Sequence, residues 1–283
     1  MSILKRYSIE EIRQCLKEGK LPISGITRFG STEFHFREPA SYVGVALHNG
    51  NRVGSEVLEA MEVGQEERFR EEDPHTDSFI QDFPLQLIAR DSRFEYDLNR
   101  EIEKCIYPAG EKKWGLQVWN RPLTQSEIEM IYSKYREFHA LLDLIMKHII
   151  ENHNSAILFD IHSFCYQRET RTHWWQDEKP DINLGTRYIN REYFSPLIEL
   201  FLENMSGITL DGHTLRIFEN EIFPGGYLTR KYAKSHNRKV LVLAIEYKKI
   251  FMNELTGELY PQILKLLIEN LLLTKDRIVR TKL

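Results

Sequence analysis

The stretch SAILFDI at 155–161 decides the fold, because it is an almost continuous apolar run that ends at His162 and Ser163. Such a run is typical of a strand that is buried on both faces. A second run of the same kind, KVLVLAIEY, covers 239–247. We therefore expect both segments in a sheet that helices cover on both sides.

Helical patterns alternate with these strand-like runs along the chain. The longest predicted helix covers 126–152, where apolar residues recur at steps of three and four. Further helices are predicted at 8–19, 54–67, 191–204 and 257–275, and further strands at 41–47, 85–89 and 214–218. The alternation predicts a single α/β domain over 1–283, with a central mostly parallel or mixed sheet flanked by helices.

Composition excludes several classes of protein. The chain has 283 residues with 38 basic and 42 acidic side chains, a net charge of −4, which argues against a dedicated nucleic-acid binder. Hydrophobic residues make up 42%, enough for a large core, yet we find no apolar run long enough for a membrane span or a signal peptide. Cys15, Cys105 and Cys165 are too far apart for a thiolate metal motif. We expect a cytoplasmic protein, and the sequence leaves its oligomeric state open.

Polar side chains follow three of the predicted strands. His48 comes after VGVAL, His162 follows SAILFDI, and Glu246 ends VLVLAI. Sites in α/β sheets form outside the carboxyl ends of the strands, so these three residues are expected to converge on one crevice. His48 is interpreted as a metal ligand or as a turn residue that caps the next helix. Glu246 is either a general base or a structural partner of a nearby cation.

Asp160 and His162 lie two residues apart on an extended strand, so their side chains point to the same face. A carboxylate inside an apolar strand is costly unless it has a partner. Asp160 is therefore expected to orient the imidazole of a functional histidine, or to form a purely structural hydrogen bond with it.

Two loop segments carry further candidates. SRFEYDLNR at 92–100 contains Arg93 and Arg100, which can grip a substrate carboxylate with paired hydrogen bonds or simply form a salt-bridged loop. EEDPHTD at 71–77 can supply a carboxylate that completes a metal site with two histidines, or it is a solvated acidic loop.

Taken in chain order, these pieces resemble the N-formylglutamate amidohydrolase family, which belongs with the zinc carboxypeptidase and aspartoacylase-like hydrolases. The resemblance covers about 42–250 and leaves 1–40 as an N-terminal extension. The pieces that carry it are VALHNG (45–50), DPHTD (73–77), SRFEYDLNR (92–100), YREFHALL (135–142), FDIHS (159–163), NLGT (183–186), FPGGYLTRKY (223–232) and AIEY (244–247).

The resemblance implies a phosphorylase/hydrolase-like fold that holds one zinc ion per chain. It implies His48 and His162 as metal ligands, with either Asp73 or Asp77 as the third. By the same resemblance Glu246 is the catalytic carboxylate, assisted by Arg100. The substrate-binding residues that it implies are Arg93, Asn99, Arg100 and Arg230.

The implied function is zinc-dependent hydrolysis of the N-formyl or N-acyl amide of a small acidic amino acid such as N-formylglutamate. One alternative is a deacylase or carboxypeptidase that acts on another N-acyl amino acid or a modified peptide. Trp174 and Trp175, which follow FDIHS, would then form a lid or a larger pocket, unless they are a packed surface patch. A non-catalytic relative that binds a metal or a peptide is the other alternative, because Leu47 and Asn49 replace the proline and serine that usually flank the first histidine of the family.

Overall fold

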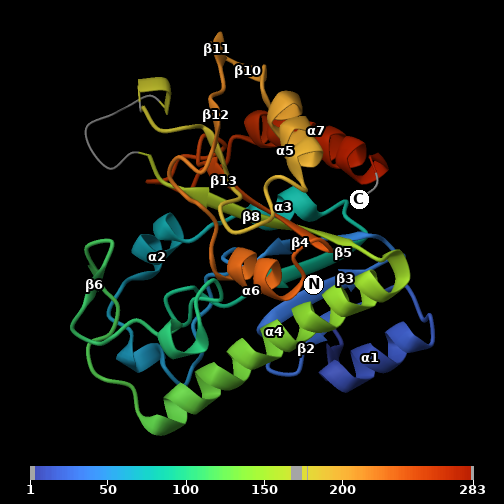
Figure 1. Cartoon of the computed structure of the whole chain (residues 1–283). Helices are drawn as coiled ribbons and strands as arrows, with labels where there is room; N and C mark the ends of the chain where they lie inside the picture. Colours follow the sequence, from blue (N-terminus) through green and yellow to red (C-terminus); the bar gives the residue numbers. More distant parts are fainter. Residues whose placement is uncertain (1–3, 167–173, 177, 282–283) are drawn as a thin grey trace.

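A mixed sheet of nine strands runs through the computed structural model, which describes residues 4–166, 174–176 and 178–281 (Figure 1). The strand order is β1-β2-β3-β5-β4-β8-β13-β9-β12. These strands are β1 (Arg6–Tyr7), β2 (Ile23–Thr27), β3 (Thr32–Phe36), β4 (Tyr42–Ala46), β5 (Leu85–Ala89), β8 (Ala156–Phe164), β9 (Ile182–Gly185), β12 (Ile217–Glu219) and β13 (Val240–Lys248). Two hairpins lie outside this sheet, β6 (Lys112–Lys113) with β7 (Leu116–Gln117) and β10 (Thr209–Leu210) with β11 (His213–Thr214).

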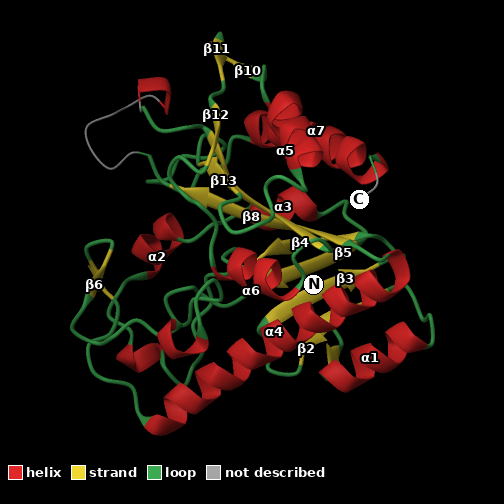
Figure 2. Cartoon of the chain, viewed as in Figure 1, coloured by secondary structure: helices red, strands yellow, loops and turns green. Residues whose placement is uncertain are grey.

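The predicted helices at 8–19, 126–152, 191–204 and 257–275 lie close to helices of the structure, whereas the short helices at 76–80 and 227–235 are not among the predicted elements (Figure 2). Both α1 and the long α4 start with a capping box, in which Ser8 pairs with Glu11 and Thr124 with Glu127. The helices are α1 (Ile9–Lys17), α2 (Gln65–Glu71), α3 (Thr76–Ile80), α4 (Gln125–His153), α5 (Ser195–Met205), α6 (Tyr227–Ser235) and α7 (Pro261–Arg280). Short 3-10 turns occur at Leu58–Ala60, Ile102–Lys104 and Trp174–Gln176.

Helices cover both faces of the sheet. Figure 1 shows α1, α4 and α6 on one face and α3, α5 and α7 on the other. Strand β8 packs against α4 on one side and α3 on the other, so every residue along it is buried. The predicted α/β fold, with a mixed sheet flanked by helices, is confirmed. None of the described helices combines the length and the apolar character that crossing a membrane requires.

The centre of the sheet is parallel, and this arrangement positions the site. Strands β5, β4, β8 and β13 run in the same direction, and Val45 pairs with Asp160 while Glu246 pairs with His162. The carboxyl ends of these strands therefore meet at one edge. His48, two residues beyond β4, reaches the same edge as His162 and Glu246.

Two of the expected elements differ from the structure. The predicted helix at 54–67 is wrong, because Gly54 donates its amide to Glu95 and Met61 forms a bridge with Trp119, which leaves only a short 3-10 turn before α2. The strand predicted at 214–218 is displaced and splits between β11 and β12. The segment 1–40 also does more than extend the chain, since β1, β2 and β3 add an edge to the main sheet.

Candidate active site

Two histidines and one aspartate form a compact buried cluster at the carboxyl edge of the sheet. Asp73 Oδ2 lies 3.1 Å from His162 Nδ1 and 3.4 Å from His48 Nδ1. One possible ligand atom from each residue lies within 4.8 Å of the other two, and all three side chains are buried. His48 Nδ1 and Asp73 Oδ1 have no hydrogen-bond partner among the described residues. Two imidazoles and a carboxylate around one point are a donor set that suits zinc.

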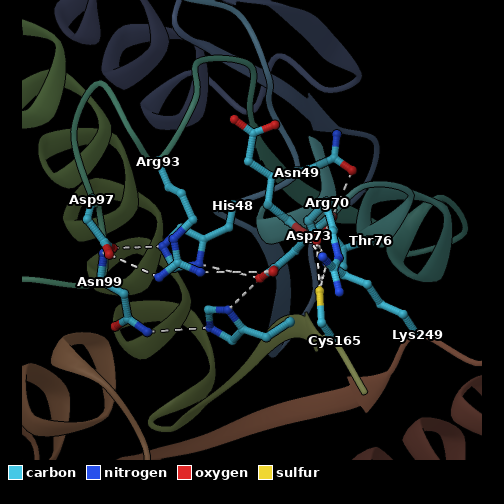
Figure 3. Close-up of polar contacts among 12 residues, drawn as sticks. His48, Asn49, Arg70, Asp73, Thr76, Arg93, Asp97, Asn99, Cys165 and Lys249 are labelled. Atoms are coloured by element: carbon cyan, nitrogen blue, oxygen red, sulfur yellow. Dashed lines mark hydrogen bonds and ion pairs between the residues drawn. The ribbon is translucent and has the colours of Figure 1, made fainter. Parts of the chain in front are cut away.

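A second carboxylate stands behind each histidine. His48 Nε2 lies 2.8 Å from Asp97 Oδ1, and His162 Nε2 lies 3.1 Å from Asp160 Oδ1 (Figure 3 shows the contact of His48 with Asp97). Because the Asp97 carboxylate accepts the Nε2–H of His48, this ring is held in the tautomer that leaves Nδ1 free to bind a metal, and Asp160 lies within ion-pair distance of His162 Nε2. The expectation that Asp160 lies beside His162 agrees with this contact.

Asp73 is held at the cluster by the turn between α2 and α3. Its amide donates to the carbonyl of His48 at 3.0 Å, and its own carbonyl accepts from the Thr76 hydroxyl at 2.7 Å. Asp77, the other candidate for the third ligand, lies in the first turn of α3 and points away from the cluster. Its Oδ2 accepts from Arg90 at 3.2 Å, outside the His48–Asp73–His162 cluster.

Asp97 is a site residue that the sequence analysis did not single out. Its Oδ2 accepts from Tyr107 Oη at 2.7 Å and from Arg93 Nη2 at 3.0 Å, while Oδ1 faces His48. The position of Asp97 between Tyr96 and Leu98, both buried, is the signal that identifies it. A carboxylate in a buried stretch requires strong partners, and here these are a cation, a hydroxyl and an imidazole.

Glu246 lies beside the cluster on β13, opposite His162 in the strand register. Burial raises the pKa of Glu246 to about 7, and the nearby carboxylates of Asp73 and Asp160 add to the shift. The side chain has no hydrogen bond or ion pair to any of the described residues. A half-buried carboxylate that titrates near neutral pH and has no partner among the described residues fits the properties of a general base.

The cluster holds more negative charge than its cations balance. Burial alone raises the pKa of Asp73, but hydrogen bonds from His162 and His48 outweigh this and hold the pKa below its usual range. Burial lowers the pKa of His162, whereas the charges of Asp160 and Glu246 outweigh it and raise the pKa well above its usual value. The carboxylates of Asp160 and Glu246 favour a proton on His162 when no metal is bound, and a divalent cation would take the place of that proton.

A cavity of about 260 Å³ opens onto the cluster. Its walls combine the metal-binding candidates with cations, aromatic rings and the Pro-Gly-Gly turn. The lining residues are His48, Glu71, Asp73, Arg93, Asp97, Asn99, Arg100, Lys113, Trp114, His162, Ser163, Phe164, Cys165, Phe223, Pro224, Gly225, Gly226 and Glu246. The sequence signals of Lys113 and Trp114 are weak, because they lie on a two-residue strand and its turn.

The predicted substrate-binding residues divide into two groups. Arg93, Asn99 and Arg100 line the cavity, and Asn99 Nδ2 lies 3.5 Å from His162 Nε2. Arg230 lies elsewhere: it is exposed on α6, with its guanidinium 5.5 Å from the ring of Tyr188.

Trp174, Trp175 and His139 are not among the residues that line the cavity. Trp174 and Trp175 contact each other edge to face, and Trp175 stacks on His213 with ring centroids 4.5 Å apart. His139 on α4 lies behind the site, where its Nε2 is 3.2 Å from the carbonyl oxygen of Leu98.

Comparisons with known proteins identify the family of the chain and agree with its fold. The model of the N-formylglutamate amidohydrolase family matches residues 40–252. A crystal structure of N-formylglutamate amidohydrolase from Ralstonia eutropha superposes with a TM-score of 0.70 at 19% identity, covering 89% of this chain and 99% of that chain. A gene product of Agrobacterium tumefaciens gives a TM-score of 0.58 at 16% identity, covering 92% and 98%.

These two structures show the shared fold, and the family model shows the relationship. A comparison with curated proteins finds no match. The match of the family model spans most of the chain, including every strand end that carries a site residue. The chain therefore belongs to the N-formylglutamate amidohydrolase family, whose members hydrolyse an amide bond.

Proposed function

We propose that this protein is a zinc-dependent amidohydrolase that cleaves the N-formyl or N-acyl amide of a small acidic amino acid, with N-formylglutamate as the first substrate to test. The observation that carries the proposal is the pair of histidines that turn Nδ1 toward Asp73, beside the half-buried Glu246 and a cavity lined by cations.

His48, Asp73 and His162 are the residues that would hold the zinc ion. His48 Nδ1 and Asp73 Oδ1, which form no hydrogen bond to the described residues, together with the excess of carboxylates, support this assignment. When bound, zinc lowers the pKa of a water molecule and polarises a carbonyl group. Asp97 would keep the imidazole of His48 in the ligating tautomer, with Asp160 beside that of His162.

Glu246 would act as the general base and then as the general acid. It takes a proton from the attacking water and later delivers a proton to the leaving amine. The raised pKa of this carboxyl, about 7, favours both transfers near neutral pH.

The cations of the cavity would bind the charged parts of the substrate. Arg93, anchored by Asp97, is close enough to the cluster to stabilise the oxyanion that develops at the acyl carbon. Arg100 and Asn99 would hold a substrate carboxylate. A cavity of about 260 Å³ suits an acyl amino acid better than a peptide.

Leu47 and Asn49, the unusual neighbours of His48, leave the cluster intact and so favour a catalytic protein over a non-catalytic relative. Leu47 is buried in the hydrophobic core. The Asn49 side chain points to the start of α3, where its Oδ1 accepts from the Thr76 hydroxyl at 3.4 Å (Figure 3). The same oxygen accepts from the amide of Asp77 at 3.2 Å.

Hydrolysis of N-formylglutamate by the zinc-loaded protein tests the proposal, with N-acetylglutamate, N-formylmethionine and formylated peptides as competing substrates. In the Glu246→Gln variant we expect kcat to fall by about 10²–10⁴-fold while bound zinc is unchanged, because the amide cannot transfer a proton. Full activity of Glu246→Gln would show that Glu246 is not the base. A wild-type protein that hydrolyses only larger substrates would contradict the proposed substrate class.

A further inference from the structure

We propose that Lys113 is a specificity-determining residue whose ammonium group binds the side-chain carboxylate of the substrate, while Arg100 binds the other carboxylate. This inference rests on the proposed function and deepens it, because it assigns the preference for an acidic amino acid to a particular side chain. The argument depends on the position of the hairpin, its aromatic contacts and the charges around it.

The β6–β7 hairpin brings Lys113 to the cavity. Trp114 and Gly115 form its turn with φ of 49° and 85°, and positive φ at both positions is typical of a tight two-residue hairpin. Successive side chains of a strand point to opposite sides. Lys113 lines the cavity, whereas the neighbouring Lys112 is exposed and is not part of its wall.

Aromatic packing holds the hairpin in this position. The ring of Trp114 contacts Phe94 edge to face at 5.7 Å and Tyr107 at 6.2 Å. Phe94 and Tyr107 are buried residues of the segment that also carries the site arginines. The ammonium of Lys113 lies 4.6 Å from the centroid of Trp114 and 5.5 Å from that of Tyr107. Contacts of this kind restrict a flexible lysine to one side of the cavity.

The same two rings bring Lys113 close to the arginines. The guanidinium of Arg93 lies 4.7 Å from the ring of Trp114, and that of Arg100 lies 5.0 Å from the ring of Tyr107. Three cations therefore surround two adjacent aromatic rings at one wall of the cavity.

Only one of these three cations is paired with a carboxylate among the described residues. Arg93 is paired with Asp97, whereas Arg100 donates to the carbonyl of Lys104 and Lys113 forms no ion pair. Burial lowers the pKa of Lys113, and the charges of Arg100 and Arg93 lower it further. Two neighbouring cations without counter-ions favour a ligand that carries two negative charges.

An N-acylated acidic amino acid carries two carboxylates. With one on Arg100 and the other on Lys113, its amide faces the cluster at the inner end of the same cavity. The matching amino acid with a neutral side-chain amide has nearly the same shape but leaves Lys113 unpaired. Lys113 therefore separates the two substrates by charge.

Steady-state kinetics of Lys113→Met on N-formylglutamate and N-formylglutamine tests the inference. We expect the ratio of the two kcat/KM values, glutamate over glutamine, to fall about tenfold or more, mainly through KM for N-formylglutamate. Lys112→Met is the matched control, since it removes the same charge from the same hairpin outside the cavity. It should leave the ratio within about twofold of the wild type.

The outcomes separate this inference from the proposed function. If the wild type hydrolyses N-formylglutamate and Lys113→Met keeps the wild-type ratio, the inference is overturned and the function stands. If the wild type hydrolyses neither substrate, the proposed function fails. The role of Lys113 in binding a dicarboxylate is then tested by calorimetric titration of the wild type and Lys113→Met with glutarate. About tenfold weaker glutarate binding by Lys113→Met would support its role; equal binding, or no binding to the wild type, would overturn it.

Discussion

At the scale of single residues, Gly226 sets how closely the Pro-Gly-Gly turn approaches Asn99. A Cβ atom added at Gly226 would lie 2.1 Å from Asn99 Nδ2, well inside van der Waals contact. Asn99 is fixed from this side, because its Oδ1 accepts from the amide of Leu228 and its carbonyl from the amide of Tyr227. The glycine therefore permits the contact that keeps Asn99 beside His162.

Gly226→Ala is expected to lower the stability by about 1–3 kcal/mol and to raise KM, because the added methyl group displaces Asn99. Thermal unfolding and kinetics on N-formylglutamate measure both effects. Gly64→Ala is a suitable control, since its added Cβ would meet only the Glu67 carboxylate, at 3.3 Å. An unchanged KM in Gly226→Ala would mean that Asn99 does not contribute to substrate binding.

At the scale of an element, α4 supports the site through His139. This buried histidine packs against Tyr135 at 4.3 Å and Tyr227 at 5.4 Å, and its Nε2 faces the carbonyl of Leu98 next to Asn99. Burial, and to a smaller extent the charge of Lys231, lowers the pKa of His139 from 6.5 to about 3. The helix therefore holds a neutral imidazole against the loop that carries the substrate-binding residues.

The lowered pKa of His139 predicts acid sensitivity. Between pH 3 and 6.5, His139 binds fewer protons in the folded protein than in the unfolded chain. The contribution of the neutral His139 to the free energy of unfolding is therefore complete above pH 6.5 and is lost as the pH falls toward 3. From pH 7 to 5 the loss is about 2 kcal/mol. Urea unfolding should show a correspondingly smaller loss in His139→Gln. The account of His139 is wrong if both proteins lose the same stability.

Elements with a strong periodic or apolar signal could be predicted from the sequence. α4, β8 and β13 lie where the pattern places them, because a long apolar period or an unbroken apolar run is a local signal of burial whatever the packing partner is. The helix predicted at 54–67 is absent because this segment instead contacts Glu95 and Trp119, which lie far away in the sequence. Local helix propensity carries no information about such contacts. The β6–β7 hairpin is too short to give a periodic signal, so Lys113 could be recognised only from the structure.

The same distinction applies to the site. His48 follows one buried strand, and His162 and Glu246 lie near the carboxyl ends of two others. The parallel sheet brings these ends together, so the convergence of the three residues could be predicted. The choice between Asp73 and Asp77 as the third ligand could not be predicted, because both residues belong to one short polar segment of the sequence. Only the observed turn before α3 shows that Asp73 points to the cluster and Asp77 to Arg90. Arg230 has the right charge, but its helix carries it to the surface.

At the scale of the whole molecule, the net charge of −4 conceals a local separation of charge. Carboxylates gather at the inner end of the cavity around His48 and His162, whereas Arg100 and Lys113 stand at its outer wall without carboxylate partners among the described residues. The inner end favours a metal cation and the outer wall favours an anion. A weakly acidic protein can in this way concentrate a dicarboxylate substrate beside a metal site.

The zinc content and the N-formylglutamate activity of Asp73→Ala and Asp77→Ala, measured on the same samples, test the central claim most directly. Asp73→Ala should lose bound zinc and activity together, while Asp77→Ala should keep about one zinc per chain and near wild-type turnover. Far-UV circular dichroism verifies that both variants are folded. Full zinc and full activity in Asp73→Ala would contradict the assignment of the metal site and of the chemistry that depends on it.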